Sequence, residues 1–364
     1  MKRKRKNIYE KINKKTNEIT YTIKFNYRNW QGEVKQKKKE GFKNQKEAIA
    51  FERSFREKTQ SDPEISFGSL VNQYMDDCKA RFRPTTFSNK KILINSKILP
   101  YFQKMPVNEI DGLTVRKWQT ELLNDEKKYS PTYLKTINNQ LSAIFNFAIR
   151  YYGLKASPAR AAGSMGKKDA DSMSFWTLDE YQKFLAEISD DIQYKVIYEL
   201  LFWTGIRIGE LTALTLDDFN FEAKTMSINK SYTKLEGKDY ISKPKTSKSE
   251  RSININISLS NLVQEYVEHL YDYNPTQRLF EISKANIRKR METATIKAGL
   301  KKIRVHDLRH SHASLLIEQG FSPLLISERL GHEDIRTTLK TYSHLYPNKQ
   351  GEVADRIEKL QKKV

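Results

Sequence analysis

The sequence predicts a mainly α-helical protein with small β elements, arranged as several domains along the chain. Strict alternation of apolar and polar residues, typical of half-buried strands, occurs near the N-terminus and in two short stretches beyond residue 220. Apolar residues at helical spacing cover most of the rest. At 364 residues the chain is long enough for two or three domains, each with its own core. We therefore expect an N-terminal three-stranded sheet with one helix, a helical second domain and a mixed α/β third domain.

The composition points to a polyanionic partner. Lys and Arg number 65 against 44 Asp and Glu, a formal net charge of +21, which favours nucleic acid first and an acidic membrane surface second. We expect neither an integral membrane protein nor a signal peptide, because no long apolar run occurs and none follows the basic residues 1–6. Cys78 is the only cysteine, which excludes an internal disulfide and a cysteine-ligated zinc site and fits a reducing, cytoplasmic setting.

The N-terminal segment, residues 1–60, is the most basic part of the chain. It contains 19 Lys and Arg against 7 Asp and Glu, so +12 of the total charge lies in one sixth of the sequence. Residues 18–28 alternate strictly and predict a strand, residues 33–39 predict a second basic strand, and a shorter strand over residues 7–12 precedes both. Such a sheet is suited to bind DNA, and the alternative is a purely structural subdomain.

A helix over residues 44–58 is predicted to cover one face of this sheet, because Ala48, Phe51 and Phe55 recur at helical spacing. The other face would then expose basic side chains. The candidate DNA contacts are basic residues of the two longer strands: Lys24, Arg28, Lys35 and Lys37.

Residues 64–154 have a helical pattern and no cluster of catalytic residue types, which favours a binding domain. The clearest helix begins after Ser130, a natural N-cap followed by Pro131, and ends at Gly153. Its apolar stripe consists of Leu134, Ile137, Leu141, Ile144, Phe145 and Ala148. The next residues, 155–173, are rich in Ala, Ser, Gly and Lys without periodicity and are predicted to be a linker.

Residues 174–348 form the predicted third domain. Thr177 and Glu180 have the spacing of a capping box, which marks the start of its first helix. Residues 225–232 and 252–257 alternate and predict a short sheet or hairpin, with the polar stretch around Lys245 between them. Beyond this domain, residues 349–364 have the apolar spacing of a short terminal helix.

Three motifs of the third domain supply groups suited to a phosphodiester. Thr204-Gly205-Ile206-Arg207 precedes Glu210, His306 and Arg309 are three residues apart, and Tyr342 follows Gly331-His332 by ten positions. Forked guanidinium donors stabilise the charge on the non-bridging oxygens, and a histidine can transfer protons. A tyrosine nucleophile conserves the bond energy in a phosphotyrosine, so that the strand can be rejoined without ATP.

Each motif alone has an ordinary interpretation. Arg207 and Glu210 have the spacing of a surface ion pair, and some His-x-x-Arg sequence is expected by chance. A lone tyrosine is usually a half-buried packing residue, and Tyr346 competes with Tyr342 by position. The remaining histidines of the second motif, His310 and His312, are expected to be structural or to face solvent.

In combination these motifs resemble the tyrosine recombinase, or phage integrase, family over residues 175–348. The resemblance implies a catalytic set of Arg207, Lys245, His306, Arg309, His332 and Tyr342. The two arginines would clamp the phosphate, the first histidine would act in acid/base transfer, the second would hydrogen-bond the phosphate, and the tyrosine would attack. Glu210 resembles the supporting acidic residue. The lysine would protonate the leaving oxygen, with Lys243 and Lys248 as neighbouring alternatives to Lys245.

The family resemblance also implies the partners. These are double-stranded DNA with core sites for residues 64–154 and arm-type sites for residues 1–60, sister protomers in a homotetramer, and an accessory excision or DNA-bending protein. The basic N-terminal segment favours an integrase of a phage or conjugative element. The terminal helix would dock onto a neighbouring protomer or pack on its own domain. We expect no cofactor and no metal. The alternatives are a type IB topoisomerase and a DNA-binding regulator without catalytic activity.

Overall fold

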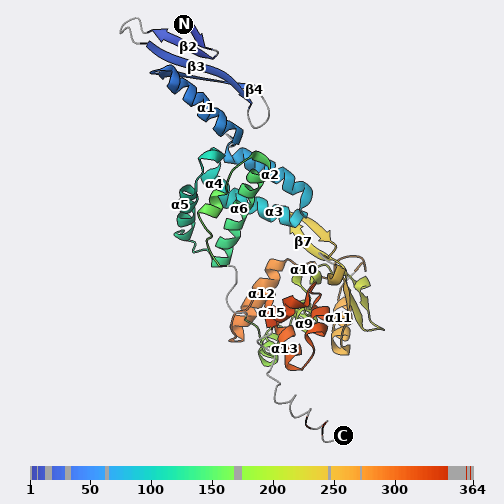
Figure 1. Cartoon of the computed structure of the whole chain (residues 1–364). Helices are drawn as coiled ribbons and strands as arrows, with labels where there is room; N and C mark the ends of the chain where they lie inside the picture. The colour runs from blue at the N-terminus through green and yellow to red at the C-terminus, as the bar shows by residue number, and fades with distance from the viewer. Residues whose placement is uncertain are drawn as a thin grey trace. The chain divides into compact units, whose positions relative to one another are not determined.

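The computed structural model describes residues 2–5, 7–12, 19–28, 34–61, 65–167, 174–244, 247–270, 273–342, 358 and 361 (Figure 1). The chain divides into two compact units, residues 1–171 and 172–364. Every helix within the described ranges is too short or too polar to cross a lipid bilayer.

An antiparallel sheet and one helix form the N-terminal part of the first unit. The sheet has the order β1 (Lys2–Arg5), β2 (Ile8–Ile12), β3 (Ile19–Arg28) and β4 (Val34–Phe42), and α1 (Gln45–Ser61) follows it. The three predicted strands and the helix are present. The additional edge strand β1 was not predicted, because its four residues are all basic and have no alternation.

The register of β3 and β4 divides the four candidate DNA contacts between the two faces of the sheet. Phe25 is buried, and its cross-strand partner Lys37 lies with its Nζ 5.1 Å from the Phe55 ring of α1. Directly opposite residues share a face, so Lys37 lies on the covered side. Lys24 is exposed and pairs with Lys38 on the other side.

The four candidate DNA contacts therefore do not all lie on the face opposite α1. Lys35 pairs with Tyr27 and shares the face of Lys37. Arg28 pairs with Val34 in the backbone register, and its side chain lies outside the described residues. Alternation within one strand defines two sets of side chains, but only the pairing with the neighbouring strand shows which set the helix covers.

The helical part of the first unit confirms the predicted pattern. Its elements are α2 (Phe67–Arg81), α3 (Pro84–Leu93), the π-helix η1 (Ile94–Ile98), α4 (Leu99–Phe102), η2 (Val107–Glu109), α5 (Gly112–Leu123), α6 (Pro131–Tyr152) and α7 (Pro158–Ala161). The predicted caps of α6 are present: the Ser130 hydroxyl accepts the Tyr133 amide, and Gly153 has a φ of 71°. Large buried side chains fill the core, including Phe67, Phe102, Trp118 and Phe145.

Part of the predicted linker belongs to this helical core, which corrects the expected range of residues 155–173. Met165 is buried, and Gln119 Nε2 donates to the Gly163 carbonyl at 2.9 Å. Gly166 has a φ of 76°, and a Cβ there would lie 2.1 Å from the Pro131 carbonyl oxygen, so only glycine fits. Small residues were needed here for close packing onto α6, which composition alone cannot distinguish from a linker. Residues 168–173 lie outside the described residues.

The second unit begins with the predicted capping box, in which Thr177 and Glu180 exchange hydrogen bonds. Its first elements are α8 (Leu178–Ala186), α9 (Ile192–Thr204), α10 (Ile208–Leu211), η3 (Leu216–Asp218), β5 (Phe219–Asn220), β6 (Thr225–Ile228), β7 (Ser231–Leu235), β8 (Lys238–Ser242), η4 (Ser247–Ser249) and β9 (Arg251–Asn254). Strands β5, β6 and β9 form one sheet, and β7 and β8 form a hairpin. The predicted strand over residues 225–232 is divided between β6 and β7. Lys230, which lies between them, forms an ion pair in which its Nζ is 2.7 Å from Asp218 Oδ2.

Helices complete the second unit. They are α11 (Ile257–Glu268), α12 (Lys284–Lys297), α13 (Asp307–Glu318), α14 (Pro323–Leu330) and α15 (Ile335–Tyr342). The apolar helix α9 packs against α11 and α13, which brings the Thr204-Gly205 turn beside the second and third motifs (Figure 1). The predicted terminal helix over residues 349–364 lies outside the described residues, apart from Glu358 and Gln361.

Candidate active site

The turn at the end of α9 places the first arginine. Gly205 closes the helix with a φ of 67°, and a Cβ there would lie 2.7 Å from both His312 and Leu330, so this close approach requires glycine. Arg207 follows as the N-cap of α10. Its amide donates to Glu210 Oε2 at 2.9 Å and its Nη1 to Glu210 Oε1 at 2.8 Å. Arg207 thus lies just before α10, and the Glu210 carboxylate accepts hydrogen bonds from both its backbone amide and its guanidinium.

Glu210 also binds Arg251, a residue that the sequence did not identify. Arg251 Nη2 lies 3.0 Å from Glu210 Oε2, and both side chains are buried. Burial favours a higher pKa for Glu210, but attraction and hydrogen bonds from Arg251 and Arg207 outweigh it and lower the pKa. The carboxylate is therefore charged at neutral pH. Arg251 Nε donates to the Arg329 carbonyl at 2.9 Å, which ties β9 to the end of α14.

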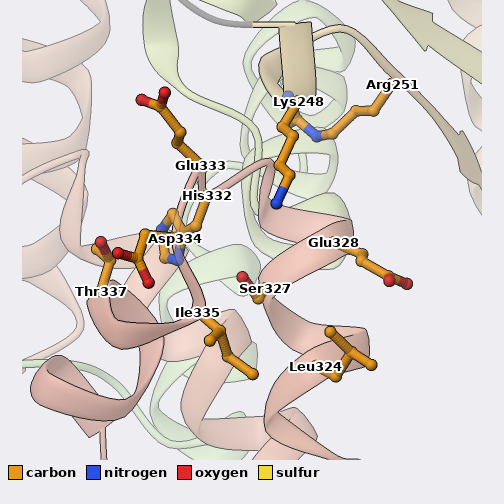
Figure 2. Close-up of a pocket in the computed structure, with 10 residues that line it drawn as sticks. All are labelled: Lys248, Arg251, Leu324, Ser327, Glu328, His332, Glu333, Asp334, Ile335 and Thr337. Carbon is orange, nitrogen blue, oxygen red and sulfur yellow. The ribbon is translucent and has the colours of Figure 1, made fainter.

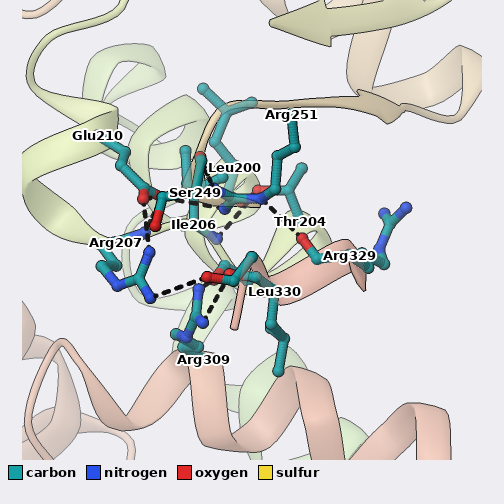
Figure 3. Close-up of polar contacts among 12 residues, drawn as sticks. Leu200, Thr204, Ile206, Arg207, Glu210, Ser249, Arg251, Arg309, Arg329 and Leu330 are labelled. Atoms are coloured by element: carbon teal, nitrogen blue, oxygen red, sulfur yellow. Dashed lines mark hydrogen bonds and ion pairs between the residues drawn. The ribbon is translucent and has the colours of Figure 1, made fainter. Parts of the chain in front are cut away.

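The second arginine is fixed by backbone carbonyls from two distant turns. Arg309, 3 % exposed, donates from Nη1 to the Gly205 carbonyl at 2.8 Å and from Nη2 to the Leu330 carbonyl at 2.7 Å (Figure 3). Arg207 Nη2 donates to the adjoining Gly331 carbonyl at 3.4 Å. Burial and the charge of Arg207 lower the pKa of Arg309 to about 9, so it remains a cation at neutral pH. Two guanidinium groups are thus brought to one place.

His306 and His332 flank these arginines. His306 is exposed at the N-cap of α13, and its pKa is lowered by partial desolvation and by the charges of Arg309 and Arg207. His332 directly follows the left-handed Gly331 after α14, and its Nδ1 lies 2.8 Å from Thr338 Oγ1. Burial and the nearby arginines lower the pKa of His332 to about 3. Both rings are neutral at neutral pH in the free protein.

Tyr342 lies at the end of α15, 1 % exposed, in an apolar cluster with Ala313, Ile317, Ile326 and Leu330. Burial raises the pKa of its phenol to about 12, while the charge of Arg309 acts in the opposite direction. Its hydroxyl oxygen lies 2.6 Å from His310 Nδ1.

His310 and His312 differ from each other in their surroundings. The expectation of a structural residue fits His312, which is buried and accepts a hydrogen bond at Nε2 from Arg329 Nε at 3.1 Å. His310, in contrast, contacts the predicted nucleophile. Its position directly after Arg309, on the same helix as His306, was the only signal in the sequence that could have indicated this contact.

A hollow of about 920 Å³ opens beside His332 (Figure 2). Lys248 and Arg251 line it from the segment around β9, and Ser327 and Glu333 line it from α14 and the following turn. Lys248, one of the two alternatives to Lys245, thus lines the same hollow as His332, the predicted phosphate-binding histidine. Lys245 itself lies outside the described residues.

The structure therefore brings together five of the six predicted catalytic residues and Glu210. The arrangement offers fixed cationic donors for an anion next to a buried phenol and neutral imidazoles. Within the described ranges, no group of three or more His, Cys, Asp or Glu could hold a metal ion.

Comparison with known proteins gives the family. Residues 174–349 match the phage integrase family, and residues 66–123 match the N-terminal SAM-like domain of phage integrases. The ICEBs1 integrase of Bacillus subtilis (strain 168) is 32 % identical over 334 residues, covering 86 % of this chain and 90 % of the relative. The chain belongs to the phage integrase family. It is an enzyme of the tyrosine-type site-specific recombinase class.

Other members of the family extend over similar lengths. The integrase of Staphylococcus phage L54a is 25 % identical over 333 residues, covering 81 % of this chain and 93 % of the relative. The Tn1549 transposon integrase in complex with a circular intermediate DNA has a TM-score of 0.67 at 19 % identity, covering 81 % of this chain and 99 % of that one. A lambda integrase dimer bound to a COC′ core site has a TM-score of 0.61 at 18 % identity, covering 96 % and 97 %. These structures share the fold.

Proposed function

We propose that the chain is a DNA integrase that cuts and rejoins strands through a covalent 3′-phosphotyrosine at Tyr342. The observation that supports this most is the convergence of the Arg207 and Arg309 guanidinium groups with the Tyr342 phenol, although Arg207 stands more than a hundred residues before the other two in the sequence. A site built only to bind DNA would not need a phenol beside a neutral histidine pair.

Arg207 and Arg309 clamp the scissile phosphate in this proposal. The Arg207 side chain is 38 % exposed and can receive the substrate, while Arg309 is held rigidly from behind by two carbonyls. A guanidinium has five N–H donors, so Arg309 keeps donors for the phosphate after binding both carbonyls. Donors fixed in advance stabilise the charge that develops on the non-bridging oxygens.

The remaining groups transfer protons and orient the phosphate. In this proposal His332 Nδ1 accepts a hydrogen bond from the buried Thr338 hydroxyl, which leaves the ring proton on Nε2, where it is donated to a phosphate oxygen. The phenol oxygen attacks phosphorus and the bond from phosphorus to the 5′ oxygen breaks. Neutral His306 takes up the phenolic proton as the phenol releases its hydrogen bond to His310. Lys245 donates a proton to the leaving 5′ oxygen.

The proposed substrate is double-stranded DNA with core and arm-type sites, and the biological result is integration and excision of a mobile element. The charge of +21 supports DNA as the partner, as do the solved relatives that are bound to DNA. We propose assembly as a homotetramer on two DNA sites, together with an accessory excision or DNA-bending protein.

Tyr342→Phe tests the nucleophile. We expect the variant to form no covalent adduct with a nicked duplex taken from the ends of the element that encodes the chain, because the attacking oxygen is lost. Its affinity for the same duplex should stay unchanged. Adduct formation is measured by denaturing gel electrophoresis, with Tyr346→Phe as the matched control. An adduct formed by Tyr342→Phe would show that the nucleophile is assigned wrongly.

The register of the N-terminal sheet gives a test of arm-site binding. We expect Lys24→Ala combined with Lys38→Ala, on the face opposite α1, to weaken arm-duplex binding and to reduce the slope of log affinity against log salt by about 0.9 per lost phosphate contact. Lys37→Ala, on the covered face, is the control and should change the slope less. Equal effects of the two variants would contradict binding through the open face.

A further inference from the structure

His310, which contacts the Tyr342 hydroxyl, is not one of the six proposed catalytic residues. His310 is half-buried on α13, one position after Arg309, so the two side chains leave the helix in different directions. Arg309 points to the Gly205 and Leu330 carbonyls, while His310 Nδ1 reaches the Tyr342 hydroxyl at 2.6 Å. A single turn of α13 thus carries both Arg309, which is proposed to clamp the phosphate, and His310, the hydrogen-bond partner of the Tyr342 phenol.

The protonation states of the two rings allow the phenol to donate this hydrogen bond to the imidazole. Burial and the neighbouring His306 lower the pKa of His310 to about 4, so the imidazole is neutral at neutral pH. Burial raises the pKa of Tyr342 to about 12, so the phenol keeps its proton. A neutral imidazole has one unprotonated nitrogen, and with its proton on Nε2 the ring accepts at Nδ1 from the phenol.

Apolar side chains pack in the same cluster as the Tyr342 ring. Ala313, Ile317, Ile326 and Leu330 belong to the same buried cluster, and such contacts hold the plane of the ring without directing its oxygen. His310 itself is supported on another side by His306, whose ring centre lies 5.3 Å away at an interplanar angle of 85°. The acceptor is therefore anchored between the proposed proton acceptor and the proposed nucleophile.

We propose that His310 is a positioning residue: its Nδ1 accepts the Tyr342 hydroxyl and fixes the direction from which the phenol oxygen approaches the scissile phosphate. This inference rests on the proposed function, in which Tyr342 is the nucleophile. Alignment of the attacking atom strongly affects the rate, since a misplacement of about 1 Å can cost about a hundredfold.

Two variants distinguish the effect of losing the hydrogen-bond acceptor from the effect of losing the volume of the His310 ring. His310→Asn keeps an oxygen acceptor near the position of Nδ1, whereas His310→Leu has a similar size and no acceptor. We expect His310→Leu to slow single-turnover adduct formation on the nicked duplex by about 10- to 100-fold with unchanged duplex affinity. His310→Asn should recover most of that rate. His269→Ala, at an exposed histidine after α11, is the control and should match the unmodified protein.

The outcomes distinguish this inference from the proposed function. Equal rates for His310→Leu and His310→Asn, whether slow or fast, would overturn the positioning role, because the acceptor would then be irrelevant. A rate for His310→Leu at or above that of the unmodified protein would overturn it as well. Tyr342→Phe is run alongside: its inactivity keeps the nucleophile in place in either case, whereas its activity would contradict the proposed function itself.

Discussion

Replacing Arg309 with lysine is expected to slow strand cleavage by about 10²- to 10³-fold, the effect typical of losing one fixed donor to a developing oxyanion. The guanidinium spans two carbonyls, those of Gly205 and Leu330, and presents further donors in a rigid plane. A lysine ammonium keeps the charge but is a point donor on a flexible stem. It cannot hold both turns and the phosphate in the same geometry.

The measurement is single-turnover cleavage of the nicked duplex at saturating protein, with duplex affinity determined in parallel. Arg290→Lys is the matched control, because Arg290 forms its ion pair with Asp190 at 3.1 Å, on an exposed carboxylate. A cleavage rate for Arg309→Lys within about threefold of that of the unmodified protein would contradict the role of the rigidly held guanidinium.

Glu210→Gln is expected to lower the free energy of unfolding by about 3–5 kcal/mol at pH 7, as for a buried ion pair that loses one partner. The carboxylate is 5 % exposed and accepts from both Arg207 and Arg251. A neutral amide of the same size leaves these cations without a counter-charge, close to the buried Arg309. The amide NH₂ would also face guanidinium donors instead of accepting from them.

The difference in the free energy of unfolding between the unmodified protein and Glu210→Gln should depend on pH in a defined direction. The pKa of Glu210 is lowered in the folded state from its usual 4.5, so its contribution to stability is complete above that value and is lost as the pH falls below it. The difference in the free energy of unfolding between the unmodified protein and Glu210→Gln should therefore narrow as the pH falls below 4.5 towards the lowered pKa of the folded state.

Urea unfolding at several pH values measures this difference. Glu292→Gln is the control, since Glu292 pairs with Lys302 at the surface and should contribute less than about 1 kcal/mol. If Glu210→Gln lowers the free energy of unfolding by no more than the control does, Arg207 and Arg251 need no counter-charge.

Local signals were sufficient wherever a feature depends on residues within one turn of each other. The Ser130 cap, the Gly153 end of α6 and the Thr177–Glu180 capping box follow from hydrogen bonds that span at most five positions, and all are present. Five of the six candidate catalytic residues lie in the three motifs, and their roles came from the resemblance of these motifs in combination to the phage integrase family. Lys245, the sixth, came from the resemblance alone.

The arrangement of those residues depended on packing between distant segments. Pairing with Arg251 makes Glu210 a buried bridge, and the approach of α15 to α13 makes His310 the partner of Tyr342. Strand pairing likewise decided that Lys37 lies on the covered face and Lys24 on the open one. The burial of a side chain, its counter-charge and the face of the sheet on which it lies all depend on residues far away in the sequence. They are therefore decided only by the packing of the apolar core, which determines which segments meet.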